Sequence, residues 1–158
     1  MSAPIRYVVG FLFDGPAKYV ALIRKQKPAW QAGKLNGIGG KIEPGETPLQ
    51  AMEREFAEEA GVADLRWQAT AVIQGGSFEL HVFHAFDGRI LSARTMEDEL
   101  VEIHPVQVLL GRRDLMPNLM ALIALALDDS GITKPVRLMD ERPQPGPKAT
   151  LGETHGEC

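Results

Sequence analysis

The chain has 158 residues, of which 44% are apolar and 24% are charged, and its formal net charge is −4. This composition is ordinary for one globular domain, and the acidic balance argues against a surface that coats DNA or RNA, because such a surface is basic. Cys158 is the single cysteine and no apolar run is long enough to span a bilayer. We therefore expect a cytoplasmic domain with no disulfide and with neither nucleic acid nor membrane as a partner.

The first part of the chain predicts a hairpin followed by a long loop. Residues 5–13 and 19–24 are rich in β-branched and aromatic side chains, which favour strands, and Asp14-Gly15-Pro16 between them indicates a turn. Residues 25–45 contain five glycines and no regular pattern. Because irregular loops of this length are uncommon in compact domains and are usually functional, this loop is the first candidate for a binding site.

The next segment carries a complete set of helix signals. Thr47 is a good N-cap residue, Pro48 suits the first helical position, and Gln50 completes a capping box. The predicted helix runs to Ala60, and Gly61 is the expected C-terminal stop.

The second half predicts further strands, one more helix and a tail. Strands are expected at 67–73, 80–86 and about 102–106, and a helix at 117–127 that is stopped by Gly131. Strands combined with two distant helices favour an α/β fold with a mixed sheet. From Lys134 onward the chain is polar and rich in proline, so we expect one domain over 1–133 and a poorly ordered tail over 134–158.

The first helix places three carboxylates on one arc. At about 100° per residue, Glu58 and Glu59 lie within about 60° of Glu55, while Glu53 falls near the far side. A separate apolar stripe on the same helix comprises Leu49, Met52, Phe56 and Ala60. A solvated acidic face is the ordinary interpretation of a Glu-rich helix. Here three like charges lie beside the buried stripe, and the neighbouring Arg54 neutralises only part of them. A divalent cation with hard oxygen ligands, Mg²⁺ or Mn²⁺, would neutralise the rest.

At this point the sequence resembles the Nudix hydrolase family, and its MutT-type branch in particular. The Nudix box is a glycine, five residues, Glu, seven residues, and then Arg-Glu-apolar-any-Glu-Glu-any-Gly-apolar. Its fixed positions are all filled here, by Gly40, Glu46, Arg54, Glu55, Phe56, Glu58, Glu59, Gly61 and Val62. The resemblance implies an α/β/α sandwich with a mixed sheet and Mg²⁺-dependent hydrolysis of a nucleoside diphosphate linked to another group.

The resemblance also implies roles for single residues. Glu55 and Glu59 correspond to metal ligands, Glu58 to a ligand or the base, and the Gly39 carbonyl to a further ligand; the base differs among family members, and Glu58 and Glu55 are the catalytic candidates. Arg54 and Glu46 correspond to a structural ion pair. A further carboxylate is expected from residues 96–100, with Glu99 as first choice and Glu97 as second; the other interpretation of that segment is a solvated acidic loop.

The glycine-rich loop suggests a substrate. Residues 35–41 resemble the Asn-Gly-x-Gly-Gly-Lys run of enzymes that act on oxidised purine triphosphates, which implies that Asn36, and Asn118 near the last helix, contact the base. The alternatives are a turn for Asn36 and a helix cap for Asn118. Leu35 stands where the family usually has Trp. Lys25 and Lys41 are candidate phosphate contacts, although exposed surface lysines are the commoner case.

These features favour one function and leave two others open. The first is hydrolysis of a purine nucleoside triphosphate, oxidised or not, to a monophosphate and pyrophosphate. The others are hydrolysis of ADP-ribose or a dinucleotide polyphosphate, and nucleotide sensing without turnover. The sequence does not decide between a monomer and a homodimer.

Overall fold

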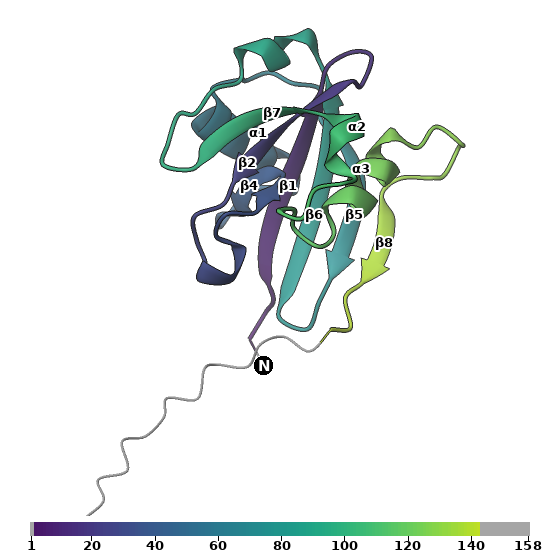
Figure 1. The fold of residues 1–158 in the computed structure, drawn as a ribbon. Coiled ribbons are helices and arrows are strands. Elements are labelled where there is room, and N and C mark those ends of the chain that lie inside the picture. Colours follow the sequence, from purple (N-terminus) through teal and green to yellow (C-terminus); the bar gives the residue numbers. More distant parts are fainter. Residues whose placement is uncertain (1, 143–158) are drawn as a thin grey trace, which may run out of the picture.

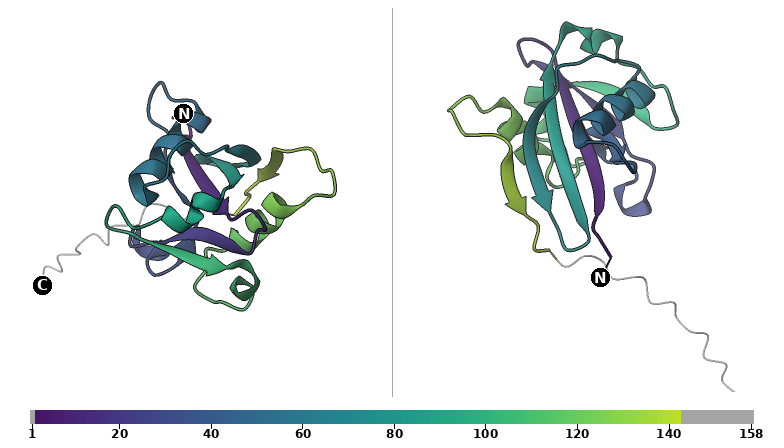
Figure 2. Two further views of the ribbon diagram at one scale, coloured as in Figure 1. Left: turned by 90° about the horizontal axis from the view of Figure 1, so that it is seen from above. Right: turned by 180° about the vertical axis from the view of Figure 1, so that it is seen from behind.

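A mixed β-sheet runs through the molecule, with helices on both of its faces (Figures 1 and 2). The structure is a computed structural model and describes residues 2–142. In chain order the elements are β1 (Ile5–Phe13), β2 (Tyr19–Arg24), the 3-10 turn η1 (Ala29–Gln31), β3 (Leu35–Asn36), β4 (Ile38–Lys41), α1 (Pro48–Ala60), β5 (Gln68–Gln74), β6 (Phe78–Phe86), the 3-10 turn η2 (Gly88–Ser92), β7 (Leu100–Pro105), α2 (Val106–Leu109), α3 (Leu119–Leu127) and β8 (Val136–Met139).

The strand pairing confirms the predicted mixed sheet. The order is β3-β2-β1-β6-β5-β8, with β4 added beside β1 and β7 beside β2. The β1–β6 and β5–β8 pairs are parallel and the remaining pairs are antiparallel. Because β6 occupies one edge of β1 along its whole length, β4 and β2 share the other edge, β4 at residues 7–10 and β2 at residues 12–13. The sheet therefore divides where the glycine-rich segment enters it.

Two apolar layers enclose the sheet and confirm the α/β/α sandwich. On one face the buried side chains of α1 pack against the sheet, and on the other face those of α2 and α3 do (Figure 2). Met52, Phe56 and Ala60 of the predicted stripe are fully buried, but Leu49 is 42% exposed and Ala51 is buried in its place. The buried face of α1 is therefore shifted from the predicted stripe toward Ala51, which lies on the same arc of the helix as the carboxylates.

The ends of α1 form as predicted. The Thr47 hydroxyl accepts from the backbone N–H of Gln50 at 3.1 Å, and the Gln50 side chain accepts from the backbone N–H of Thr47 at 2.9 Å. Gly61 ends the helix with φ at 72°, a conformation in which glycine carries no Cβ penalty. The signals that start and end α1 thus lie within the helix and its flanking residues.

The structure corrects the prediction of an irregular loop over residues 25–45. This segment contains η1, β3 and β4. Strand propensities do not predict β3 and β4, because the segment is rich in glycine, which is depleted in strands. They are present because the backbone lies very close to β1: a Cβ added to Gly39 would be 1.9 Å from the carbonyl oxygen of Val8. Backbone pairing, and not a side-chain pattern, makes β4 a strand.

The structure also corrects two predictions near the C-terminus. Helix α3 ends at Leu127 as predicted, with Asp128 as its C-cap, but it begins at Leu119 rather than at Pro117. The expected tail begins as a strand, because β8 pairs in parallel with residues 71–74 of β5. Every residue of β8 is at least partly exposed, so its stability comes from backbone pairing with the open edge of β5. Its sequence has no buried apolar stripe from which the strand could be predicted. The rest of the predicted tail, residues 143–158, lies outside the described residues.

No helix within residues 2–142 combines the length and apolar character that crossing a bilayer requires.

Candidate active site

Two carboxylates of α1 lie against the glycine-rich strand β4. The Glu55 side chain is 14% exposed and sits directly over Gly40, where an added Cβ would come within 2.5 Å of Glu55 Oε1. One turn further along, the Oε2 atom of Glu59 is buried and has no hydrogen-bond partner among the described residues. An ionised carboxylate left in this state is costly, so Glu59 points to a ligand that supplies the missing interaction.

Burial and like charges raise the pKa of both carboxyls. Burial is the largest cause for Glu59, whose pKa rises to about 8; Glu55 adds to the rise, Lys25 opposes it, and Glu99 and Glu97 contribute further negative charge. For Glu55, burial also raises the pKa against the opposing effect of Arg54. The carboxylates of α1 therefore interact as like charges with Glu97 and Glu99, as the sequence predicted for a carboxylate cluster.

Arg54 connects α1 to the loop before it. Its Nε and Nη2 atoms donate to the two carboxylate oxygens of Glu46 at 2.8 and 2.9 Å, and this pairing lowers the pKa of Glu46 to about 2. Its Nη1 atom donates to Glu55 at 2.9 Å and to Glu58 at 3.3 Å, and Nη2 also reaches the Lys41 carbonyl. The predicted Arg54–Glu46 pair is thus present, and the same guanidinium orients Glu55. Glu58 stands at the rim, with its side chain 49% exposed.

The loop before β7 brings Glu99 to the cluster. Lys25 Nζ donates to Glu99 Oε1 at 2.8 Å, and the backbone N–H of Gln26 donates to Oε2. Burial acts to raise the pKa of Glu99, but these hydrogen bonds outweigh it and hold that pKa below its usual value. The Glu99 side chain is 12% exposed, whereas Glu97 is exposed. The geometry therefore favours Glu99 over Glu97 as the carboxylate from this loop.

A cavity of about 660 Å³ adjoins the cluster through Gly40, which lies under Glu55, and through Lys25, which pairs with Glu99; the carboxylates themselves are not on its wall. Three predicted substrate contacts, Asn36, Asn118 and Lys25, lie on its wall together with Gly39 and Gly40. Lys41 does not line the cavity; its side chain is exposed, and its carbonyl accepts from Arg54. The structure therefore brings most of the predicted substrate-binding residues to one place and leaves Lys41 outside it.

The two asparagines differ in their hydrogen bonding. Asn36 Oδ1 accepts from the backbone N–H of Gly37 at 2.9 Å, so the turn interpretation holds for its oxygen while its amide N–H groups remain available. Asn118 occupies the N-cap position of α3 without a side-chain capping bond. Its amide therefore has both donor and acceptor capacity facing the cavity.

Sequence reasoning missed aromatic and charged residues of the cavity wall. Trp30 from η1 and Phe78 from β6 both line it, and they supply the aromatic surface that the buried Leu35 does not. Asp140 and Arg142 line it from beyond β8. Trp30 carried a weak signal, as a lone Trp in a glycine-rich loop, but the charged pair carried none because its strand was not expected.

The donor chemistry of the cluster fits a divalent cation. Among residues 2–142, no three His, Cys, Asp or Glu side chains already form a metal cage, and Arg54 and Lys25 hold Glu55, Glu58 and Glu99 in ion pairs. The unpartnered, buried Glu59 Oε2 beside Glu55 nevertheless offers hard oxygen ligands and excess negative charge, the combination that Mg²⁺ and Mn²⁺ prefer.

Comparison with known proteins decides the family. A model of the NUDIX domain matches residues 4–122. The chain belongs to the NUDIX family. The match covers the sheet up to β7 together with α1, α2 and the first turn of α3, so it includes the carboxylate cluster and the cavity wall apart from Asp140 and Arg142.

Two curated relatives within the NUDIX family match a short stretch of the chain. An oxidized purine nucleoside triphosphate hydrolase of Danio rerio is 49% identical over 41 residues, which is 26% of each chain. An 8-oxo-dGTP diphosphatase of Escherichia coli is 49% identical over 43 residues, or 27% of this chain and 33% of that protein. The matches thus span about a quarter and a third of the lengths of these relatives.

Solved NUDIX structures share the fold at low sequence identity. A MutT NUDIX hydrolase from Burkholderia pseudomallei gives a TM-score of 0.66 at 20% identity, covering 78% of this chain and 98% of that one. The NUDIX domain of Shewanella oneidensis NrtR, crystallised with ADP ribose, gives a TM-score of 0.69 at 18% identity, covering 80% and 88%. These likenesses support the fold.

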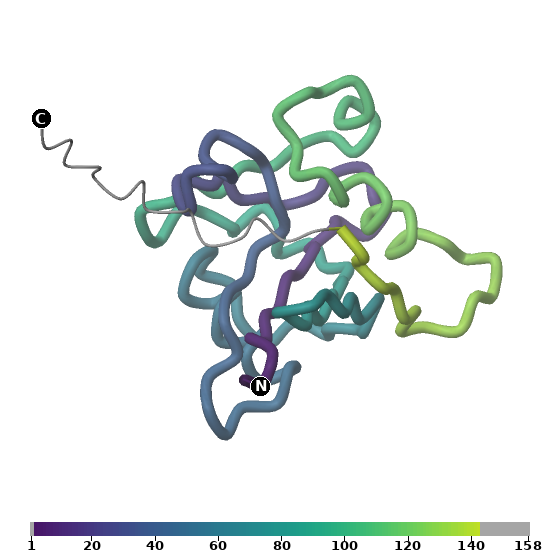
Figure 3. The backbone as a smooth tube through the Cα atoms, turned by 90° about the horizontal axis from the view of Figure 1, so that it is seen from below, coloured from purple at the N-terminus to yellow at the C-terminus, as the bar shows by residue number. Residues whose placement is uncertain are grey.

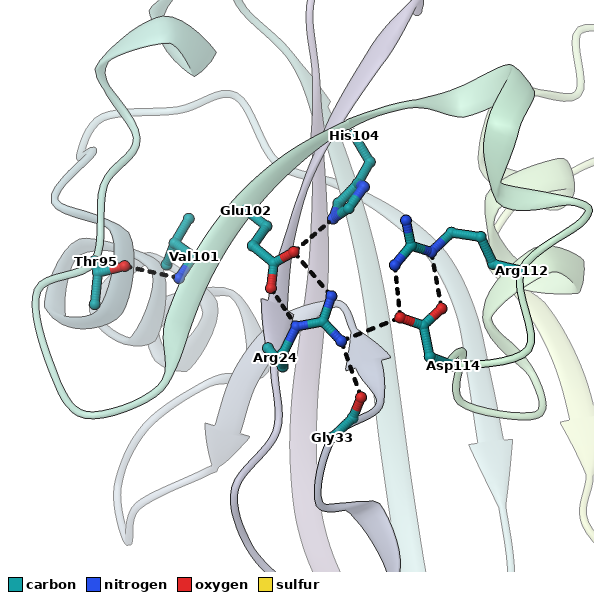
Figure 4. Close-up of polar contacts among 8 residues, drawn as sticks. All are labelled: Arg24, Gly33, Thr95, Val101, Glu102, His104, Arg112 and Asp114. Atoms are coloured by element: carbon teal, nitrogen blue, oxygen red, sulfur yellow. Dashed lines mark hydrogen bonds and ion pairs between the residues drawn. The ribbon is translucent and has the colours of Figure 1, made fainter.

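An ion network next to the NUDIX site ties its loops together (Figure 4). Arg24, at the end of β2, donates to Glu102 of β7 at 2.9 Å, to the Gly33 carbonyl at 3.0 Å and to Asp114 at 3.1 Å. Arg112 donates to the same Asp114 carboxylate at 2.6 Å. The network joins the glycine-rich loop, the strand that follows Glu99, and the segment leading to Asn118.

Replacing Arg24 should therefore weaken the contacts among these three segments. We expect Arg24→Gln to lower the free energy of unfolding by about 1–3 kcal/mol, because Glu102 and Asp114 lose a charged donor in a half-buried setting. Urea unfolding of the two proteins measures the change. Arg113→Gln is the matched control, since Arg113 is exposed next to the network; equal unfolding midpoints for both variants would show that the network does not stabilise the fold.

Proposed function

We propose that this protein is a magnesium-dependent pyrophosphohydrolase that converts a purine nucleoside triphosphate, oxidised or not, to a monophosphate and pyrophosphate. The observation that carries the proposal is the buried, unpartnered Glu59 Oε2 beside Glu55, next to a cavity of about 660 Å³. A cluster built only for stability would not leave a carboxylate oxygen buried without a partner. The cavity offers room for a nucleotide next to this charge.

Five groups would hold the metal. They are the side chains of Glu55, Glu59, Glu58 and Glu99 and the Gly39 carbonyl. When bound, a divalent ion neutralises phosphate oxygens and lowers the pKa of water, which is the chemistry that cleavage of a diphosphate requires.

The protein's own side chains supply the remaining functions. Arg54 fixes Glu55 in place and donates to Glu58. Glu58 is half exposed at the rim and is held there only by the 3.3 Å contact from Arg54, so its outer side can face the attacking water and accept its proton as the general base. Water attacks a phosphorus in line, the bond to the bridging oxygen breaks, and no covalent enzyme intermediate forms. Lys25 lies on the cavity wall, where it pairs with Glu99 and offers a cation to a phosphate.

The base end of the cavity suits a purine. Asn36 and Asn118 present amide groups that can donate and accept. Trp30 and Phe78 offer aromatic faces on the same wall. The curated relatives, which are named for oxidised purine triphosphates, support this substrate class.

Hydrolysis of a nucleotide panel tests the proposal. Purified protein is titrated with Mg²⁺ in the presence of dGTP, 8-oxo-dGTP, dATP and dCTP, and pyrophosphate and phosphate are measured separately. We expect pyrophosphate with the purines, and we expect Glu58→Gln to retain the fold and lose most turnover. Glu53→Gln, on the exposed side of α1, is the matched control. Full activity of the Glu58 variant would remove that residue from the mechanism, and absence of turnover with every nucleotide would refute the proposed activity.

A second candidate is hydrolysis of ADP-ribose. It is favoured by the likeness to the NrtR domain that was crystallised with ADP ribose. The products distinguish the two, because ADP-ribose yields AMP and ribose phosphate and releases no pyrophosphate. Binding of ADP-ribose without any product would instead favour a nucleotide sensor.

A further inference from the structure

The segment that follows β8 carries an ion pair to the cavity wall. The Asp140 backbone N–H donates to the Gln74 carbonyl at 2.8 Å, which fixes the segment to β5. Arg142 donates from Nε to Asp140 Oδ1 at 2.9 Å and from Nη2 to Oδ2 at 2.6 Å. The Asp140 side chain is 8% exposed and that of Arg142 is 60% exposed. Asp140 is therefore a buried anchor that holds an accessible guanidinium in one orientation.

This pair stands where two cavities meet. Asp140 and Arg142 line the cavity of about 660 Å³ and also a second cavity of about 620 Å³ between α3 and β8. These two elements, α3 and β8, lie side by side (Figures 1 and 3). Asn118 belongs to both walls as well. Asn118, Asp140 and Arg142 thus place three polar side chains on the wall that the two cavities share.

The sheet order separates this group from the carboxylate cluster. Strands β1 and β6 lie between β4, which carries Gly39 and Gly40, and the β5–β8 pair that carries Asp140. A nucleotide whose phosphates lie beside Glu55 and Glu59 therefore directs its base toward β8. Arg142 is thus suited to contact the base rather than the hydrolysed phosphates.

The donor capacity of Arg142 determines what it can recognise. Asp140 occupies Nε and one N–H of Nη2, and among residues 2–142 the Nη1 atom has no partner. A guanidinium is a donor only, and arginine commonly reads guanine through its acceptors. The O6 carbonyl is an acceptor that both guanine and 8-oxoguanine carry.

We propose that Arg142, oriented by Asp140, is a specificity-determining residue that donates a hydrogen bond to the O6 carbonyl of a guanine-type base. Asp140 is a positioning residue that acts through Arg142. The proposal rests on the proposed function, because it assumes that a nucleoside triphosphate occupies the larger cavity.

Three nucleotides that differ at this atom test the proposal. Both dGTP and dITP carry O6, whereas the triphosphate of 2-aminopurine deoxyriboside lacks it. We expect Arg142→Gln to raise KM for dGTP and dITP by about tenfold or more, with kcat unchanged and with KM for the 2-aminopurine nucleotide close to that of the wild type. Arg142→Lys should behave in the same way, because it keeps the charge and loses the oriented fork, and Asp140→Asn should shift KM in the same direction. Arg137→Gln, on the exposed face of β8, is the matched control and should resemble the wild type.

Each other result overturns the inference. Unchanged KM values in Arg142→Gln, while the wild type hydrolyses dGTP, would remove Arg142 from recognition and leave the proposed function standing. An equal rise in KM for all three nucleotides would show that Arg142 senses negative charge and not the base. Absence of wild-type turnover on all three nucleotides would refute the proposed function, and the inference with it.

Discussion

Replacing Glu59 by Gln should abolish turnover and at the same time make the metal-free protein more stable. We expect activity to fall by more than about 100-fold, because even a residue that only supports a metal ligand commonly contributes 10–100-fold. At pH 8 and above, where the wild-type carboxyl is ionised, we expect the free energy of unfolding to rise by about 1–3 kcal/mol, the usual cost of an unsatisfied buried polar group. In that range a Gln side chain removes one of the like charges. Chemical denaturation without metal, together with an assay for pyrophosphate, measures both effects.

The pH dependence of stability separates this explanation from a general packing effect. The pKa of Glu59 in the folded protein is about 8, above its ordinary value of 4.5, so the folded state holds a proton that the unfolded chain releases. The stabilising contribution is present below pH 4.5 and is lost as the pH rises through 8. We expect the metal-free wild type to lose stability across this window and Glu59→Gln to lose less. Glu53→Gln should show the same pH dependence as the wild type. Equal free energies of unfolding for Glu59→Gln and the wild type at pH 8 would contradict this explanation.

Replacing the two neighbouring glycines of β4 by Ala should damage the protein in two different ways. A Cβ on Gly39 would lie 1.9 Å from the Val8 carbonyl oxygen, which is backbone inside the sheet. A Cβ on Gly40 would lie 2.5 Å from the end of the Glu55 side chain. We expect Gly39→Ala to lower the free energy of unfolding by about 3 kcal/mol or more, because backbone cannot move aside cheaply. Gly40→Ala should fold and lose most of its activity, since Glu55 is displaced from its position beside Arg54.

Thermal unfolding and turnover measured on both proteins test this contrast. Gly76→Ala is the matched control, because an added Cβ there meets nothing within 4 Å and its stability should change by about 0.5 kcal/mol at most. Full activity in Gly40→Ala would show that the position of Glu55 does not matter for turnover. A Gly39→Ala protein as stable as the wild type would show that the close approach of β4 to β1 is not required.

Much of the fold was predictable because its signals are local. Helix α1 carries its own start, stop and buried stripe, and the structure shows the capping box at Thr47 and the left-handed Gly61. The hairpin of β1 and β2 follows from side-chain pattern and one turn. The carboxylate arc is a property of helical spacing and needed no tertiary information, whereas its position over Gly40 is a contact between α1 and β4.

The parts that sequence reasoning missed depend on contacts between distant segments. Strand β4 exists because glycines let the backbone lie against Val8, and strand β8 exists because β5 offers an open edge. The pairing of Lys25 with Glu99 joins residues 74 positions apart, and no local pattern contains it. The same holds for Arg142, whose place in the cavity follows entirely from β8.

The sheet is complete only when the chain extends through β8. A chain cut after residue 133 would expose the backbone amides and carbonyls of β5 that β8 now covers. Uncovered edges of this kind template the addition of a strand from another molecule. In addition to bringing Asp140 and Arg142 to the cavity, strand β8 replaces this edge by one of four residues, and short edge strands limit such pairing.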